Sequence, residues 1–133
     1  MSPASTLPKW LSDAVGSLAA GDIDGWTGIF VPDAVYEIPF APQGRPQRLE
    51  GREQIAAYMS RLPGILRFGA LTDVRVREAG DELIVEAVGH HHRIAEDMPF
   101  DVSYIWFITH HEGRVSHMRD YMGQRQPSAG QEP

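Results

Sequence analysis

The chain has 133 residues, no cysteine and a formal net charge of −6. This length suits one domain, which buries about two-thirds of the surface that its unfolded chain exposes. The lack of cysteine excludes thiolate catalysis, cysteine-ligated zinc and disulfides, and the negative charge argues against a nucleic-acid partner, whose phosphates attract clustered Lys and Arg.

We expect the two ends of the chain to lie outside the folded domain. Residues 1–8 have neither the basic start nor the apolar run of a secretory signal, so we interpret them as an N-terminal extension. Residues 124–133 are polar and contain Gly and Pro, which predicts a flexible C-terminal tail. The single domain then covers residues 9–123. It has no run that approaches the roughly 18 apolar residues of a membrane span, so we predict a cytoplasmic protein without a membrane partner.

Three helices are predicted in the first half of the chain. Over residues 9–20, apolar side chains recur at three- and four-residue spacing, which is typical of an amphipathic helix. Asp22 is a suitable N-cap for a second, short helix over residues 23–31, in which Phe30 belongs to the apolar side. A third helix with its own apolar stripe is predicted over residues 51–62.

Five strands are predicted, one after the second helix and four in succession after the third. The first covers residues 34–40, where alternation places Tyr36, Ile38 and Phe40 on one face. A loop with two prolines and a glycine follows. The later strands are expected at residues 71–77, 82–94, 102–109 and 115–122. This order predicts an α+β fold, in which a curved, mainly antiparallel sheet forms a cone with the three helices packed on its concave face.

The last predicted strand carries an acidic residue on its apolar face. Because side chains alternate along a strand, Asp120 lies on the same face as Met118 and Met122, opposite His117 and Arg119. A carboxylate that is desolvated there has a raised pKa, and a buried titratable group in a cleft is a candidate for a functional site. The alternative is a structural role, in which Asp120 pairs with an arginine or caps a backbone amide.

Large side chains on the inward faces are the candidate lining of a pocket for a small hydrophobic molecule. They offer more aromatic and sulfur surface than a core of this size requires. The alternative is that they fill the core, because such residues at regular spacing more often serve packing. The predicted substrate-binding residues are Tyr36, Ile38, Phe40, Tyr58, Trp106, Met118 and Met122.

Two more polar residues are predicted to face the same interior. Alternation along the strand turns His91 inward and its neighbours His90 and His92 outward, so the three consecutive histidines are a poor metal site. An inward imidazole serves as a base or proton shuttle, or as a hydrogen-bonded structural residue. Tyr104 can donate a hydrogen bond to a developing oxyanion. Because phosphate-binding and dinucleotide motifs are absent from the sequence, we predict chemistry without a cofactor or a metal.

Several short motifs occur in a characteristic order, at residues 20–26, 32–37, 49–55, 112–115 and 118–121. In this order they resemble the nuclear transport factor 2-like superfamily, in its ketosteroid isomerase-like and SnoaL-like branches. The resemblance covers about residues 9–123 and implies the cone-shaped fold and a homodimer formed through the outer sheet face. The catalytic aspartate of SnoaL-like cyclases corresponds to Asp120. The second acid of ketosteroid isomerases corresponds to Tyr104, and their base aspartate corresponds to Ile38, so steroid isomerisation is not implied.

The leading hypothesis is a cofactor-independent acid/base enzyme of the isomerase, cyclase or dehydratase type. It would act on a small hydrophobic carbonyl compound, with Asp120 as general acid or base, Tyr104 as hydrogen-bond donor and His91 as an auxiliary proton carrier. A non-catalytic binding protein, in which Asp120 only orients the ligand, is the alternative. A third hypothesis is a protein whose sheet chiefly mediates dimerisation, because Phe107 and Tyr121 leave large side chains on the outer face.

Overall fold

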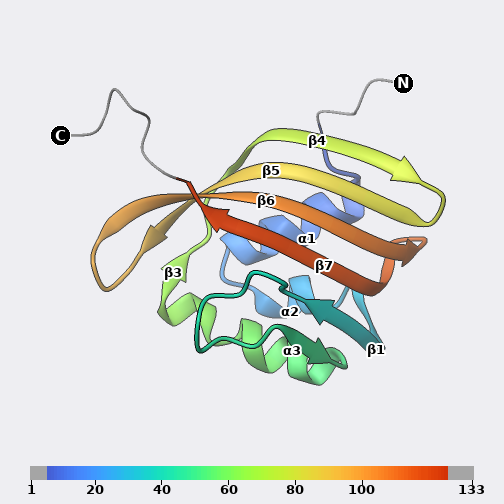
Figure 1. Cartoon of the computed structure of the whole chain (residues 1–133), viewed down its shortest axis with the longest axis horizontal. Coiled ribbons are helices and arrows are strands. Elements are labelled where there is room, and N and C mark those ends of the chain that lie inside the picture. The colour runs from blue at the N-terminus through green and yellow to red at the C-terminus, as the bar shows by residue number, and fades with distance from the viewer. Residues whose placement is uncertain (1–5, 126–133) are drawn as a thin grey trace.

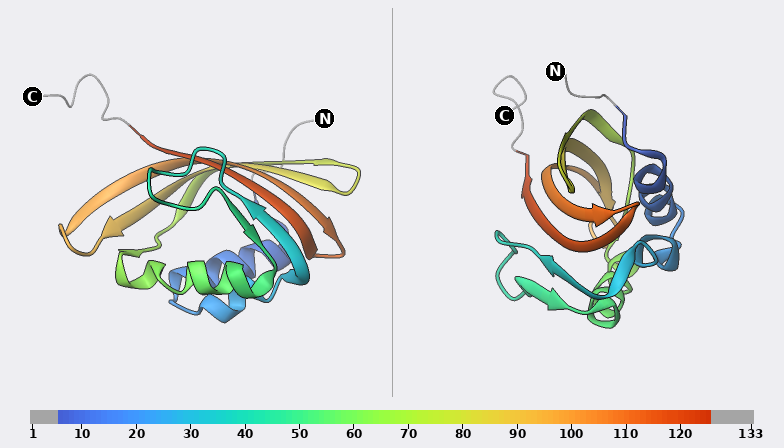
Figure 2. Two further views of the ribbon diagram at one scale, coloured as in Figure 1. Left: turned by 60° about the horizontal axis from the view of Figure 1, so that its bottom comes forward. Right: turned by 90° about the vertical axis from the view of Figure 1, so that its right-hand side faces the viewer.

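The computed structural model describes residues 6–125, so residues 1–5 of the expected extension and residues 126–133 of the expected tail lie outside the described residues. Within the described part, three α-helices lie beneath a strongly curved sheet (Figure 1). Figure 2 shows the sheet curling over the helices, so that its concave face and the helices enclose the interior. The predicted α+β class and helix-covered concave sheet are confirmed. The helices are α1 (Lys9–Ala19), α2 (Ile23–Thr27) and α3 (Arg52–Met59), followed by a short 3₁₀ helix, η1 (Leu62–Gly64).

The sheet has seven strands within residues 6–125 and follows the order β2-β1-β7-β6-β5-β3, with β4 also paired to β5. Its pairing is antiparallel except between β1 and β7, which run parallel. The sheet is therefore mixed but mostly antiparallel. The strands are β1 (Phe30–Glu37), β2 (Arg48–Glu50), β3 (Leu66–Arg67), β4 (Leu71–Ala79), β5 (Glu82–Arg93), β6 (Met98–His111) and β7 (Arg114–Gln124).

The helices form where apolar spacing and capping predict them. In α1, the buried residues Leu11, Ala14 and Leu18 follow one another at three- and four-residue intervals and pack against the sheet. The carboxylate of Asp22 accepts a hydrogen bond from the backbone N–H of Gly25 at 3.2 Å, which caps the start of α2. Burial of these stripes fixes the helices on the concave face.

The second helix is shorter than its apolar spacing predicts. It ends at Thr27, and Phe30 already belongs to β1, where it pairs with Val115 of β7 and is fully buried. The predicted helix over residues 23–31 was therefore too long. The register of β1 against β7 shifts between Phe30 and Val35, and this irregularity accommodates Pro32 inside a strand. Pairing with a strand distant in the sequence overrides the local helical spacing.

The prediction that Phe40 faces inward is wrong. Strand β1 ends at Glu37, and the chain turns where the backbone N–H of Ala41 donates to the carbonyl of Ile38 at 3.0 Å. Alternation therefore stops before Phe40, whose side chain is 71% exposed and packs edge-on against Tyr121 on the outside of the sheet. The predicted loop after it also contains β2. The homodimer expected through this outer face stays a prediction.

Candidate functional site

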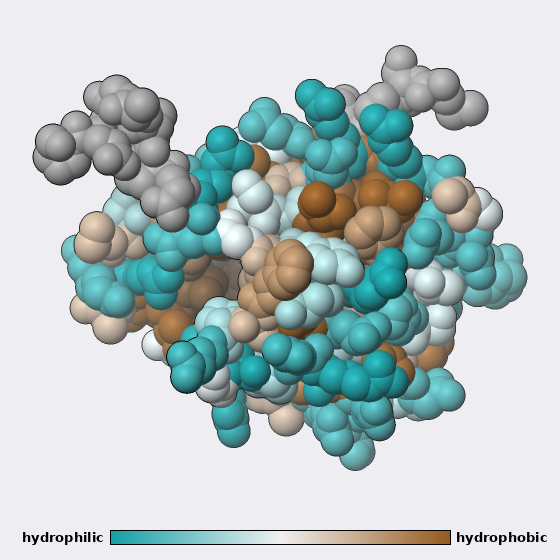
Figure 3. Space-filling view, in the orientation of Figure 1, coloured by the Kyte–Doolittle hydropathy of each residue, from teal (hydrophilic) through white to brown (hydrophobic). Residues whose placement is uncertain are grey.

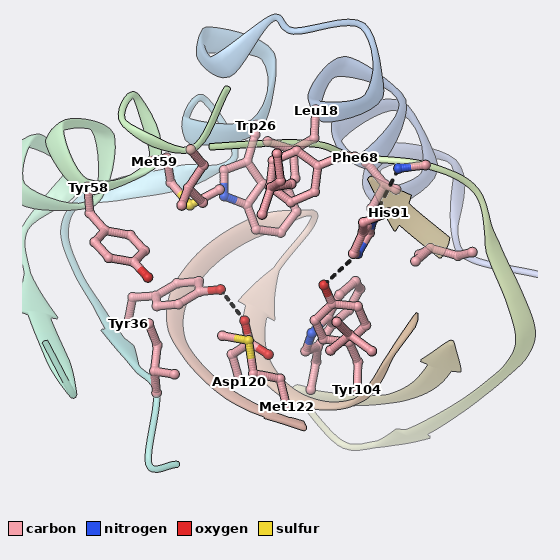
Figure 4. Close-up of a pocket in the computed structure, with 18 of the residues that line it drawn as sticks. Leu18, Trp26, Tyr36, Tyr58, Met59, Phe68, His91, Tyr104, Asp120 and Met122 are labelled. Carbon is pink, nitrogen blue, oxygen red and sulfur yellow. Dashed lines mark hydrogen bonds between the residues drawn. The ribbon is translucent and has the colours of Figure 1, made fainter. Parts of the chain in front are cut away.

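A cavity of about 150 Å³ lies between the concave face of the sheet and the helices (Figure 4). Its mouth is the dark hollow left of centre in Figure 3. Most of the wall is apolar and comes from distant parts of the chain, including Leu18, Trp26, Met59, Phe68 and Met122. A cavity of this volume with apolar walls accommodates a group of about the size of a benzene ring.

Asp120 is the one carboxyl group among the residues that line this cavity, and only 5% of its surface is exposed. Tyr36, from the parallel neighbour strand β1, donates a hydrogen bond from its hydroxyl to Oδ2 of Asp120 at 2.5 Å. Burial raises the pKa of Asp120 from 3.8 to about 6, while the donor groups of Tyr36 and Trp106 act in the opposite direction by favouring the charged form. Burial and the adjacent carboxyl group also raise the pKa of Tyr36, so its hydroxyl keeps its proton.

Among residues 6–125, the second carboxyl oxygen of Asp120 has no hydrogen-bond partner. Oδ1 is buried, and so is the indole Nε1 of Trp106, which lies directly opposite Asp120 in the pairing of β6 with β7. The nearby N–H of Trp106 stabilises the charged form of Asp120 over the protonated form. The position of this N–H relative to Oδ1 nevertheless does not meet the geometry of a hydrogen bond. An unsatisfied buried polar atom costs about 1–3 kcal/mol, so an oxygen in this state beside an apolar cavity is a candidate contact for a bound molecule.

His91 and Tyr104 form a second polar pair on the cavity wall. The imidazole Nε2 of His91 lies 2.8 Å from the hydroxyl of Tyr104, and its Nδ1 accepts a hydrogen bond from the backbone N–H of Gly69 at 3.1 Å. Burial lowers the pKa of His91, with the charge of His90 acting in the same direction and that of Asp101 opposing it. The ring is therefore neutral at pH 7 and buried among aromatic side chains.

The contact with Gly69 determines which way the hydrogen bond between His91 and Tyr104 runs. A backbone N–H can only donate, so Nδ1 of the neutral ring is the acceptor and Nε2 carries the proton. Nε2 then donates to the oxygen of Tyr104, which leaves the hydroxyl proton of Tyr104 for a different acceptor. Burial, and secondarily the charge of Asp120, raise the pKa of Tyr104, so this phenol remains a donor.

Two glycines make room for this pair. A Cβ atom on Gly89 would lie 2.4 Å from Nε2 of His91 and 2.7 Å from a ring carbon of Tyr104. A Cβ atom on Gly69 would lie 1.7 Å from the carbonyl oxygen of His90. Neither glycine was predicted from the sequence, although Gly89 lies inside β5, and a glycine inside a strand is a signal of close approach.

Most of the residues predicted to form the site face the cavity. Figure 4 shows Asp120 held by Tyr36 on one side of it and Tyr104 held by His91 on the other. The structure thus brings His91 and Tyr104 together but pairs Asp120 with Tyr36, a contact that the sequence did not reveal. The predicted wall residues that line the cavity are Tyr36, Ile38, Tyr58, Trp106 and Met122.

Two of the predicted wall residues do not line the cavity. Met118 is fully buried in the hydrophobic core, and Phe40 lies outside the sheet. The outward histidines have local partners: His90 contacts Thr72 and Asp101, and His92 contacts Asp97 at 2.7 Å. Within residues 6–125, His, Asp and Glu side chains do not form a group of three that could hold a metal ion. None of the helices in this part of the chain is long and apolar enough to span a membrane.

Comparison with known proteins gives consistent matches over most of the chain. Residues 12–118 match the SnoaL-like domain family. The chain is 33% identical over 102 residues to YesE, an uncharacterised protein of Bacillus subtilis, covering 75% of this chain and 69% of that protein. It is also 33% identical over 114 residues to an uncharacterised PhzA/B-like protein of Pseudomonas aeruginosa, covering 78% and 74% of the two chains. A solved structure from Bacillus subtilis, named as a candidate isomerase, superposes with a TM-score of 0.81 at 30% identity and covers 86% of this chain and 84% of that chain.

Proposed function

We propose that this chain, which belongs to the SnoaL-like domain family, is a cofactor-independent acid/base enzyme. The reaction would be of the isomerase, cyclase or dehydratase type. Its substrate would be a small hydrophobic carbonyl compound. The isomerase name of the similar Bacillus subtilis structure is consistent with this proposal. Proteins of one fold carry many activities, so the argument depends on the residues of the cavity rather than on the fold.

The observation that carries the proposal is the unpartnered Oδ1 of Asp120 beside an apolar cavity. With a pKa of about 6, this carboxyl group is mostly ionised at neutral pH, yet it binds a proton more strongly than an ordinary carboxylate. A general base is most effective when its pKa lies near the working pH, and such a group contributes roughly 10²–10⁴-fold to a rate.

In the proposed reaction, Oδ1 of Asp120 removes a proton from the carbon next to the substrate carbonyl. The C–H bond breaks, an O–H bond forms on the carboxyl group, and the electron pair moves into an enolate whose oxygen carries the negative charge. The hydroxyl of Tyr104 has a proton to donate to that oxygen. Return of the proton from Asp120 to another carbon completes an isomerisation. In a cyclisation, the enolate carbon would form a bond to a second carbonyl carbon of the same molecule, and Asp120 would return its proton to the resulting alkoxide oxygen.

His91 has a different role in this proposal from the one expected from the sequence. Its Nδ1 is occupied by the backbone of Gly69, and its Nε2 proton is donated to Tyr104, so it holds the phenol in place instead of carrying protons. Tyr36 does the same for the base, because its hydroxyl donates to Oδ2, the carboxyl oxygen other than the proposed base Oδ1. Each reacting group thus has one positioning partner.

Exchange of carbon-bound protons tests the proposal without knowledge of the natural substrate. Small aromatic ketones would be incubated with the protein in D₂O, and loss of the proton signal next to the carbonyl would be followed by NMR. We expect exchange in the wild type, loss of at least 10²-fold in Asp120→Asn and no change in Asp81→Asn, a matched replacement at an exposed turn residue. Ketones that bind without Asp120-dependent exchange would contradict catalysis and would support the non-catalytic binding protein.

A further inference from the structure

A second hollow adjoins the mouth of the cavity. It is an open groove of about 400 Å³ between the loop before β2, helix α3 and η1. Arg45, Tyr58 and Leu62 line both the cavity and the groove. The two spaces are therefore neighbours that share a wall.

The groove differs from the cavity in its charge. Its lining contains Arg45, Arg61 and Gln54, whereas Asp and Glu are absent from it. Within residues 6–125, neither of these arginines forms a side-chain ion pair or hydrogen bond. Arg48 at the start of β2, by contrast, is bound to Glu50 at 2.7 Å. Two unpaired guanidinium groups on one groove are notable in a chain with 18 acidic and 12 basic residues.

The two spaces accept different parts of a molecule. The cavity has room for about one ring, its walls are apolar, and Asp120 is its acidic group, so an anion inside it would be both desolvated and repelled. In the groove, the planar fork of each guanidinium can bind a carboxylate or a phosphate through two parallel hydrogen bonds. The arrangement orients a ligand with its ring inward and its negative group outward.

We infer that the substrate is an amphiphilic anion, whose ring and carbonyl enter the cavity while a carboxylate or phosphate group lies between Arg45 and Arg61. This inference rests on the proposed function for the carbonyl and adds the anionic group. It also makes the groove a binding subsite that determines specificity. Because the subsite acts through binding, it can be tested separately from the chemistry.

The test compares two probes with the same ring and ketone, the anion 4-acetylphenylacetate and its uncharged methyl ester. Binding would be followed by quenching of the fluorescence of Trp26 and Trp106, which line the cavity, and checked by calorimetry. We expect the wild type to bind the anion about 5–10-fold more tightly than the ester at low salt, and high salt to reduce this preference. Arg45→Gln and Arg61→Gln should each lower affinity for the anion about 2–5-fold and leave the ester unaffected.

The double variant Arg45→Gln/Arg61→Gln should lose the preference for the anion completely. Arg77→Gln, an exposed arginine on β4 that lines neither hollow, is the matched control and should keep it. Equal affinity of the wild type for both probes, or a preference that persists in the double variant, would overturn the inference. A third probe, 4-acetylphenyl phosphate, tells which anion the subsite prefers. Tighter binding than the carboxylate favours a phosphorylated substrate, and weaker binding favours a carboxylic acid.

The same measurements in Asp120→Asn separate this inference from the proposed function. The preference for the anion should persist there even though proton exchange is lost. If exchange proves independent of Asp120 but the preference follows Arg45 and Arg61, the proposed chemistry fails and the subsite stands. The reverse result would leave the chemistry in place and remove the anionic group from the substrate.

Discussion

Replacing Asp120 by Asn is expected to stabilise the protein at pH 8 and to change its stability little at pH 4. The pKa of the folded carboxyl group is about 6 because of burial, compared with 3.8 when it is exposed. Below pH 3.8 the group is protonated in both the folded and the unfolded chain. Between pH 3.8 and about 6 the unfolded chain loses this proton while the folded one keeps it, so stability falls over this window and stays at its lower value above it.

The difference between the two pKa values corresponds to about 3 kcal/mol of lost stability above pH 6. Asparagine has no charge to desolvate, and its amide oxygen can accept the hydrogen bond from Tyr36. Its NH₂ group then lacks a partner, which costs about 1 kcal/mol. We therefore expect Asp120→Asn to raise the free energy of unfolding by about 2 kcal/mol at pH 8, and by none or a small negative amount at pH 4.

Urea unfolding of the wild type, Asp120→Asn and Asp81→Asn at pH 4, 6 and 8 measures this quantity. The pH dependence of all other groups cancels in the difference between the wild type and the variant, provided that the slope against urea is unchanged. A loss of about 3–5 kcal/mol at pH 8 would refute the reasoning, because it would identify Asp120 as a member of a structural charge pair. A difference that does not vary with pH would show that the raised pKa is wrong.

Three further replacements test other parts of the structure. Tyr104→Phe should lower the rate of ketone proton exchange about 10²–10³-fold. It should also lower stability by about 1–3 kcal/mol, because the Nε2 proton of His91 loses its acceptor. An unchanged rate would exclude the hydroxyl as the oxyanion donor. Gly89→Ala should also lower the rate of ketone proton exchange, because the added Cβ would separate His91 from Tyr104. Gly123→Ala is the control, since a Cβ there meets open space, and it should leave the rate in the NMR assay unchanged. Phe30→Ala should destabilise the protein by about 3–5 kcal/mol in urea unfolding, while the exposed Phe40→Ala stays within about 0.5 kcal/mol. Equal effects of the two replacements would contradict the position of Phe40 outside the sheet.

Sequence periodicity is sufficient to place the central acid. Asp120, Met118 and Met122 share one face because alternation is a local property of a strand, and His91 is turned inward for the same reason. The cap at Asp22 and the order of helices and strands were also predicted from the sequence. The order of the elements specifies the α+β class. In each case the determining information lies within a few residues.

The predictions from the sequence are wrong where a helix or strand ends earlier than its periodic pattern. Alternation was extended past Glu37, where β1 actually ends, so Phe40 was placed on the wrong side. Helical spacing was extended through Phe30, because the sequence does not reveal that this residue pairs with Val115 on a strand distant in the sequence. A periodic pattern predicts which face a side chain takes but not where the element stops.

The fold class, the order of the elements and the inward orientation of Asp120, His91 and Tyr104 follow from the amino-acid sequence alone. The partners of these three residues depend on how distant segments pack. Tyr36 reaches Asp120 across 84 positions because β1 runs parallel to β7, and Gly69 reaches His91 because a loop passes over β5. These contacts depend on register and on close packing between distant segments, which local spacing does not encode. Burial raises the pKa of Asp120 and the contact with Tyr36 opposes that rise, while the contact with Gly69 sets the direction of the hydrogen bond to the phenol.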